Sequence, residues 1–251
     1  MKVGFVTDTH LGIREDSNVL ELLEDLSNAF LEENVDRVIH LGDVAHEAPR
    51  SEYSNRVGKI REIFSDFEFH MTLGNHDVQA MSQSEFEAEF DTTPNEVIWK
   101  DDETSLLLIN SAGMGSLPGV DESYPVGYFS DKALDMVETE LDDNQDVVIC
   151  THYPIQYILE YQSQPFFNIR PEYTFPCNKL EFEKLVSEYD SPSITSFCGH
   201  LHPDETVTYN SNPFDIDISV VQSVQLFDSI DGNITWWDNT YLSIDNLVFD
   251  F

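Results

Sequence analysis

Up to residue 202, short apolar runs alternate with amphipathic stretches. In the amphipathic stretches 16–33 and 131–141, apolar side chains recur every three or four residues with acidic residues between them. This spacing is that of one face of a helix. The apolar runs have the length of strands and span 3–7, 37–41, 68–73, 106–109, 147–151 and 194–198. Because strands that alternate with helices form α/β folds, we expect this class.

The pattern changes after residue 202. Apolar runs there lie close together with polar turns between them, and they span 206–209, 216–224, 234–237 and 247–251. Runs of this kind are typical of additional strands. No low-complexity segment, repeat or linker divides the chain of 251 residues. The sequence therefore predicts a sheet-rich core covered by helices, in a single domain over residues 1–251.

Five of the expected strands end in residues that bind metal ions. In chain order these ends are Asp8-Thr9-His10, Gly42-Asp43, Gly74-Asn75-His76-Asp77, His152 and His200-Leu201-His202. In an open α/β sheet such ends border one crevice. Carboxylate, imidazole and amide donors suit manganese, iron, zinc or nickel, whereas a structural zinc site usually contains cysteine. Each motif alone is a common turn, but five in order predict a metal centre.

Taken in order, these motifs resemble those of calcineurin-like metallophosphoesterases. The resemblance extends from residue 1 to about residue 204. It departs at Thr151, where many members have glycine, although the ligand that follows is retained. The resemblance implies a four-layer α/β/β/α sandwich of two mixed β-sheets flanked by helices. It also implies a binuclear metal site at the C-terminal ends of the strands.

The resemblance assigns a role to each motif residue. Two divalent metal ions would be bound, with manganese as the first expectation and iron, zinc or nickel as alternatives. His76 would face the scissile phosphate and Asp77 would orient it through a hydrogen bond, which makes them the expected catalytic pair. A hydroxide that bridges the ions would attack phosphorus. The first ion would be held by Asp8, His10 and His202, the second by Asn75, His152 and His200, and both by Asp43.

Two further residues are candidate substrate contacts. His46 stands three residues after Asp43, at the spacing of a histidine in DNA-repair nucleases of this family, and a solvated loop histidine is the alternative. Arg50 would hold a phosphate, or be an exposed loop arginine. His46 and the segment 127–155 resemble phosphodiesterase branches. We therefore expect hydrolysis of phosphodiesters of nucleotide or nucleic-acid type. The alternatives are a phosphomonoesterase or protein phosphatase, and a binding or assembly protein that retains the fold.

The charge of the chain is strongly negative. With 48 acidic and 12 basic residues, the formal net charge is −36. Repulsion between these charges weakens the compact state, but at 1 M salt the Debye length falls to about 3 Å. The acids are spread along the chain, which favours adaptation to molar salt (a halophilic protein) over an acidic tail that recruits a basic partner. The negative charge also disfavours a long contact with DNA, because the phosphates of DNA are negative too. Molar salt weakens this argument, since it screens the repulsion.

The expected environment is the cytoplasm of a cell with high internal salt. The chain opens on an expected strand rather than a signal peptide. No apolar segment approaches the length that crosses a bilayer, so no membrane partner is expected. The 3 cysteines form no CxxC pair. A phosphate ester is the expected substrate, nucleic acid is among the candidates, and the sequence makes no prediction of oligomeric state.

Overall fold

The computed structural model describes residues 1–13, 15–116, 123–143, 146–155, 176, 178–189, 193–202, 206–211, 216–221, 224, 227–230, 233–236 and 247–251. Its elements are, in chain order, β1 (Lys2–Val6), α1 (Asp16–Glu32), β2 (Arg37–His40), α2 (Arg50–Ile63), β3 (Glu68–Met71), α3 (Asp77–Ala80), α4 (Gln83–Phe90), β4 (Glu96–Lys100), β5 (Thr104–Leu108), β6 (Ala112–Ser116), β7 (Ser123–Gly127), α5 (Asp131–Asp143), β8 (Asp146–Thr151), α6 (Lys179–Val186), β9 (Ser193–Cys198), β10 (Val207–Ser211), β11 (Ile216–Val220), β12 (Phe227–Ile230), β13 (Asn233–Trp236) and β14 (Val248–Asp250).

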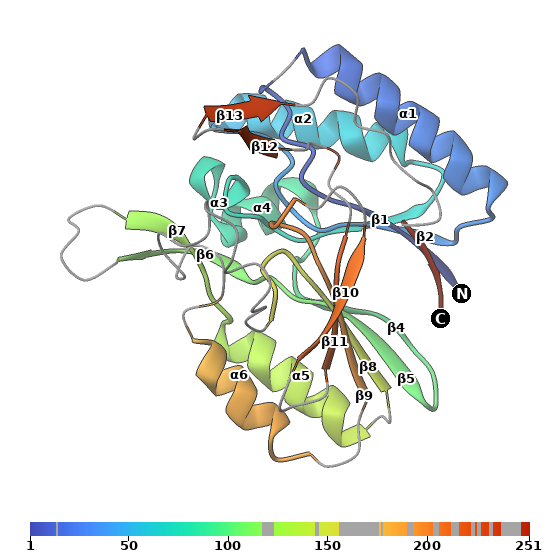
Figure 1. The fold of residues 1–251 in the computed structure, drawn as a ribbon, viewed down its shortest axis with the longest axis vertical. Helices are drawn as coiled ribbons and strands as arrows, with labels where there is room; N and C mark the ends of the chain where they lie inside the picture. Colours follow the sequence, from blue (N-terminus) through green and yellow to red (C-terminus); the bar gives the residue numbers. More distant parts are fainter. Residues whose placement is uncertain are drawn as a thin grey trace.

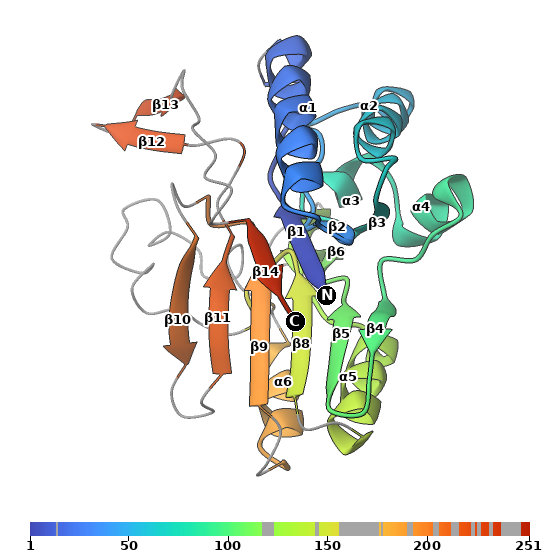
Figure 2. The ribbon, with the colours of Figure 1, turned by 90° about the vertical axis from the view of Figure 1, so that its right-hand side faces the viewer.

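Two large mixed sheets form the centre of the molecule. The first has the strand order β14-β1-β2-β3, in which β1, β2 and β3 are parallel and β14 is antiparallel. The second has the order β10-β11-β9-β8-β5-β4, with antiparallel strands at its two edges (Figure 2). Helices α1 and α2 cover the outer face of the first sheet, and α5 and α6 cover that of the second (Figure 1). The predicted four-layer α/β/β/α fold is confirmed.

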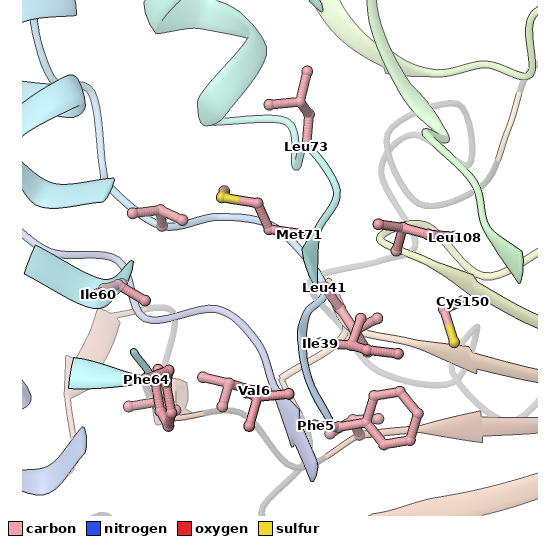
Figure 3. Close-up of a cluster of buried hydrophobic side chains, with 14 of the residues drawn as sticks. Phe5, Val6, Ile39, Leu41, Ile60, Phe64, Met71, Leu73, Leu108 and Cys150 are labelled. Atoms are coloured by element: carbon pink, nitrogen blue, oxygen red, sulfur yellow. The ribbon is translucent and has the colours of Figure 1, made fainter. Parts of the chain in front are cut away.

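Two apolar cores separate these layers. Leu106 and Leu108 of β5 point into the core between the sheets, while the residues between and after them, Leu107 and Ile109, point towards α5 and α6. Side chains of a strand alternate between its faces, so a strand buried on both faces is a continuous apolar run. Figure 3 shows Phe5 of the first sheet beside Cys150 of the second. Phe5 also stacks on Phe197 of β9, with ring centroids 4.5 Å apart.

The two ends of the chain meet in the first sheet. β14 pairs with β1, and the amino group of Met1 donates a hydrogen bond of 2.8 Å to the carbonyl oxygen of Phe251. β1 therefore lies between β14 and β2, and residues 7–11, which follow it, are buried. Among the described residues, no helix has the length and apolar character needed to cross a bilayer.

Candidate metal centre

The predicted ligands come together where strands of both sheets end. Ligand atoms of Asp8, His10, Asp43 and His202 all lie within 4.8 Å of one another, and so do those of Asp43, His152 and His200. Asp43 belongs to both groups, as a bridging ligand must. Asn75 completes the second group, because its Oδ1 lies 3.1 Å from His152 Nε2. All seven predicted ligands are thus brought into one cluster.

The donor set fits divalent ions. Asp8 and Asp43 are fully buried, and a buried charge is stable only when it is paired or binds a metal. In the described part of the chain, neither carboxylate has a lysine or arginine within 4.0 Å, and the ring nitrogens within that distance belong to histidines. His202 Nε2 lies 3.0 Å from Asp8 Oδ1, and His152 Nε2 lies 3.4 Å from Asp43 Oδ2. Such clusters of carboxylate and imidazole are typical of sites for manganese, iron or zinc.

The electrostatics keep the carboxylates charged. Burial alone would raise the pKa of Asp8 and Asp43, but the surrounding histidines lower both pKa values well below the usual range of an aspartate. Burial lowers the pKa of His10 to about 4. Burial also acts to lower the pKa of His152, but the carboxylates of Asp43 and Asp8 and the carbonyl oxygen of Leu41 together outweigh it and raise this pKa to about 9. The centre therefore carries at least two buried negative charges, which attract cations.

Backbone conformation marks the same residues. Positive φ is uncommon outside glycine, and because it costs energy it persists only where the surroundings impose it. Among the residues with φ between 40° and 67° are five predicted ligands, namely Asp8, His10, Asp43, His200 and His202. Such strain gathers at functional sites, so it supports this assignment independently of the side chains.

Backbone hydrogen bonds join the first two ligand loops. The N–H of Asp8 donates to the carbonyl oxygen of Gly42 and the N–H of His10 donates to that of Asp43, both at 3.0 Å. Gly42 itself has φ of 98°, and a Cβ added there would lie 2.6 Å from the nitrogen of Gly74. Only glycine fits this crossing of the second and third loops.

A second set of imidazoles lies beside the ligands. The rings of His46 and His76 are 4.3 Å apart between centroids, and His10 lies 4.9 Å from His76. Both His46 and His76 are partly exposed, unlike the buried His10. Burial, followed by the neighbouring His76, lowers the pKa of His46. Both histidines therefore lie at a partly exposed edge of the ligand cluster.

The prediction that Asp77 orients His76 differs from the structure. The Asp77 carboxylate accepts hydrogen bonds from the backbone N–H groups of Asp43, Val44 and Gly74, at 2.7, 3.0 and 2.8 Å. His76 Nδ1 is buried without a hydrogen-bond partner in the described residues. Asp77 begins helix α3, so its side chain turns back towards the preceding loop and the Asp43 loop beside it. Asp77 therefore joins two ligand loops and does not hold the His76 ring.

Arg50 lies at the start of helix α2, with its guanidinium held by two carboxylates. Its Nη1 lies 2.5 Å from Glu85 Oε1 and its Nη2 lies 2.9 Å from Glu89 Oε2. These contacts favour the alternative interpretation of an exposed arginine. The substrate contact of Arg50 stays a prediction.

Several residues that support the ligands were missed from the sequence. The hydroxyl of Thr7 donates to Asp8 Oδ2 at 2.7 Å, and Ser111 Oγ accepts the N–H of His152 at 3.1 Å. Tyr153 packs its ring against His200, with centroids 4.2 Å apart. Thr7 and Tyr153 are next to the ligand motifs in sequence, and Ser111 lies after the apolar run 106–109. Position beside a motif or a strand end was therefore the one sequence feature that could have indicated these residues. Threonine and serine at strand ends are too common for that signal to select them.

Comparison with solved structures shows the same fold elsewhere. A dimetal phosphatase from Danio rerio has a TM-score of 0.65 and 14% identity, covering 89% of this chain and 88% of that chain. The purple acid phosphatase PPD1 from yellow lupin (Lupinus luteus) seeds has a TM-score of 0.60 and 14% identity, covering 94% of this chain and 46% of that chain. TT1561 of Thermus thermophilus has a TM-score of 0.54 and 10% identity, covering 90% of this chain and 92% of that chain.

Sequence comparison identifies the family. No curated protein sequence matches the chain. The sequence profile of the calcineurin-like phosphoesterases matches residues 1–204, which include every strand-end motif and every ligand of the cluster. The chain therefore belongs to the calcineurin-like phosphoesterase family and is a metal-dependent hydrolase of phosphoric esters.

Proposed function

We propose that this hydrolase cleaves phosphodiesters of nucleotide or nucleic-acid type at a centre of two divalent ions, with manganese preferred. Asp43 is the residue that carries the proposal, since it belongs to both ligand groups. In this proposal one ion would be held by Asp8, His10 and His202, the other by Asn75, His152 and His200, and Asp43 would serve both. When bound, two such ions orient a phosphate and lower the pKa of a water molecule.

His76 is the residue we assign to the substrate. Its backbone N–H donates a hydrogen bond of 2.8 Å to Asp43 Oδ1, which anchors the residue to the ligand cluster while its ring stays partly exposed. An imidazole in this place can give a proton to the leaving oxygen. The ring of His46 lies 4.3 Å from that of His76 between centroids. In this proposal His46 contacts the second ester group of a phosphodiester. This pair favours diester over monoester substrates.

Two other functions remain as alternatives. A phosphomonoesterase or protein phosphatase would use the same ligands without a need for His46. A binding or assembly protein that retains the fold would tolerate the loss of ligands or of His76, yet all of these residues are present. The retained ligands favour an enzyme, and the paired histidines favour the diester.

The first test compares a diester with its monoester. Bis-p-nitrophenyl phosphate and p-nitrophenyl phosphate are assayed with Mn²⁺ in molar KCl. We expect cleavage of the diester, with kcat reduced about 10²- to 10⁴-fold in His76→Ala, the usual contribution of a positioned proton donor. His70→Ala is the matched control, because His70 lies within β3 and contacts Glu68 and Glu96. Preference for the monoester would overturn the substrate class. Absence of hydrolysis with both ions bound would favour the assembly role.

We also propose that the protein works at molar salt inside the cell. Three basic side chains, Arg50, Arg56 and Lys100, each contact two carboxylates. At a net charge of −36, the unmatched acids repel one another until salt screens them.

Stability is therefore expected to rise with salt. Between 0.1 and 2 M KCl, Tm measured by circular dichroism should increase by about 4–8 °C, which corresponds to about 2 kcal/mol for a chain of this size. Because screening is nearly complete at 1 M, most of the gain should occur below that concentration. Sucrose at equal osmolality is the control for excluded volume. A Tm that stays constant or falls with KCl would contradict the proposal.

A further inference from the structure

One more histidine lies directly beneath the candidate centre. His40 is the last residue of β2 and is fully buried. Its Nδ1 accepts the N–H of Gly42 at 3.1 Å, and its Nε2 lies 3.3 Å from Thr9 Oγ1. Gly42 directly precedes Asp43, and Thr9 stands between Asp8 and His10. One imidazole therefore contacts both of the loops that carry these three ligands.

The hydrogen bonds fix the protonation of this ring. The N–H of Gly42 can only donate, so Nδ1 of His40 must be unprotonated. The hydroxyl proton of Thr9 goes to the carbonyl oxygen of Val44 at 3.0 Å, which leaves its oxygen to accept. Nε2 of His40 therefore carries the proton and donates to Thr9. The ring is neutral, and each of its two nitrogens has one partner of the right kind.

The same network joins the loops a second time. Val44 follows Asp43, so the Thr9 hydroxyl links the first ligand loop to the second while it accepts from His40. Asp8, His10 and Asp43 all have positive φ, a conformation that persists only where surrounding contacts impose it. A leucine would fill a similar volume but would leave the buried N–H of Gly42 without an acceptor. Packing alone therefore does not explain a histidine here.

We propose that His40 is a positioning residue that sets the spacing between the Asp8–His10 loop and Asp43, and through that spacing the affinity for metal ions. The inference rests on the proposed two-metal function of those ligands. Residues that hold metal ligands in place commonly change metal affinity about 10- to 100-fold when they are replaced. His40 acts here through Gly42 and Thr9, without contact with the ions or the substrate.

Two substitutions separate its contacts. In His40→Gln the amide nitrogen can take the place of Nε2 and donate to Thr9, but the acceptor for Gly42 is lost. In His40→Asn the amide oxygen can accept from Gly42, but the shorter side chain does not reach Thr9. His40→Leu removes both. His70→Gln is the matched control, since His70 lies on the neighbouring strand and its ring contacts Glu68 and Glu96.

The experiment titrates metal-free protein with Mn²⁺ by calorimetry, well below the Tm of each variant. We expect affinity to fall about 10-fold in His40→Gln and in His40→Asn and up to about 100-fold in His40→Leu, with no change in His70→Gln. Equal affinity in wild type and all His40 variants, with only Tm lowered, would show a packing role and overturn the inference. Wild-type protein that binds no Mn²⁺ would instead overturn the two-metal function itself.

A measurement on the wild type keeps the inference testable if the variants do not fold. Nitrogen-15 NMR of the imidazole distinguishes the two neutral tautomers and the charged ring. The hydrogen bonds require an unprotonated Nδ1 and a protonated Nε2 in His40 at neutral pH. A protonated Nδ1 would be incompatible with the bond from Gly42 and would overturn the inference.

Discussion

Asparagine in place of Asp43 is expected to abolish nearly all hydrolysis while the protein stays folded. Asp43 Oδ1 accepts the N–H of His76 at 2.8 Å, and the amide oxygen of an asparagine would keep this bond. The amide nitrogen would then occupy the place of Oδ2, which lies 3.4 Å from His152 Nε2 and 3.7 Å from His10 Nε2. The variant would thus place an uncharged NH₂ group, which cannot bind a cation, where the proposed site needs a carboxylate oxygen.

The expected loss is about 10³-fold in kcat/KM for the diester, since metal ions contribute several kcal/mol to transition states of this kind. Metal content after gel filtration should fall to one Mn²⁺ or none per chain. Asp36→Asn is the control: Asp36 precedes β2 as Asp43 follows it, and its exposed carboxylate accepts the N–H of Lys2. Retention of two ions with more than about a tenth of the activity would contradict the assignment of Asp43 as the shared ligand.

The ligand cluster could be predicted because buried parallel strands are easy to recognise. Residues 38–41 and 147–150 are mainly apolar runs, interrupted only by His40, and in the structure β2 and β8 end within one residue of the ends of these runs. Asp43 and His152 come within three residues of the ends of these strands. Because the carboxyl ends of parallel strands lie at the same edge of a sheet, the motifs are expected to lie close together. His40 was hidden by the same regularity, because a histidine inside an apolar run gives no sign of what its ring contacts.

Side-chain direction was harder to predict than position. The family resemblance implies that Asp77 orients His76 through a hydrogen bond. Helix α3 begins at Asp77, however, and the first turn of a helix directs such a side chain to nearby backbone N–H groups. Three such groups were available in the two loops beside it. Local helix geometry therefore gives the Asp77 carboxylate other partners than the resemblance implies.

Helix α2 was not predicted from the sequence, because its buried face contains a charged residue. Its buried face consists of Tyr53, Arg56, Val57 and Ile60, and the arginine interrupts the apolar pattern. Arg56 is tolerated there because Asp16 and Glu52 accept hydrogen bonds from its guanidinium at 3.2 and 2.6 Å. Those partners come partly from another helix. A pattern search along one segment cannot find a buried charge that a distant segment neutralises.

Removal of the Asp77 carboxylate is expected to cause the largest loss of stability. Asp77 is fully buried and accepts three backbone N–H groups, from Asp43, Val44 and Gly74. An unsatisfied buried donor costs about 1–3 kcal/mol, so Asp77→Ala should lower the free energy of unfolding by about 3–5 kcal/mol. Asp77→Asn should lose less, because its amide oxygen can still serve the two donors that Oδ2 accepts, while its NH₂ faces the third.

Urea unfolding of the metal-free protein in molar KCl measures this loss without a contribution from bound ions. Asp101→Ala is the control, because Asp101 also accepts two backbone N–H groups, at 2.9 and 2.8 Å, but lies at the surface where water can replace it. The expected order of loss is Asp77→Ala, then Asp77→Asn, then Asp101→Ala. If Asp77→Ala and Asp101→Ala lost stability equally, the carboxylate would not be the group that joins the two ligand loops. A steep order would instead show that the carboxylate joining the two ligand loops also stabilises the fold as a whole.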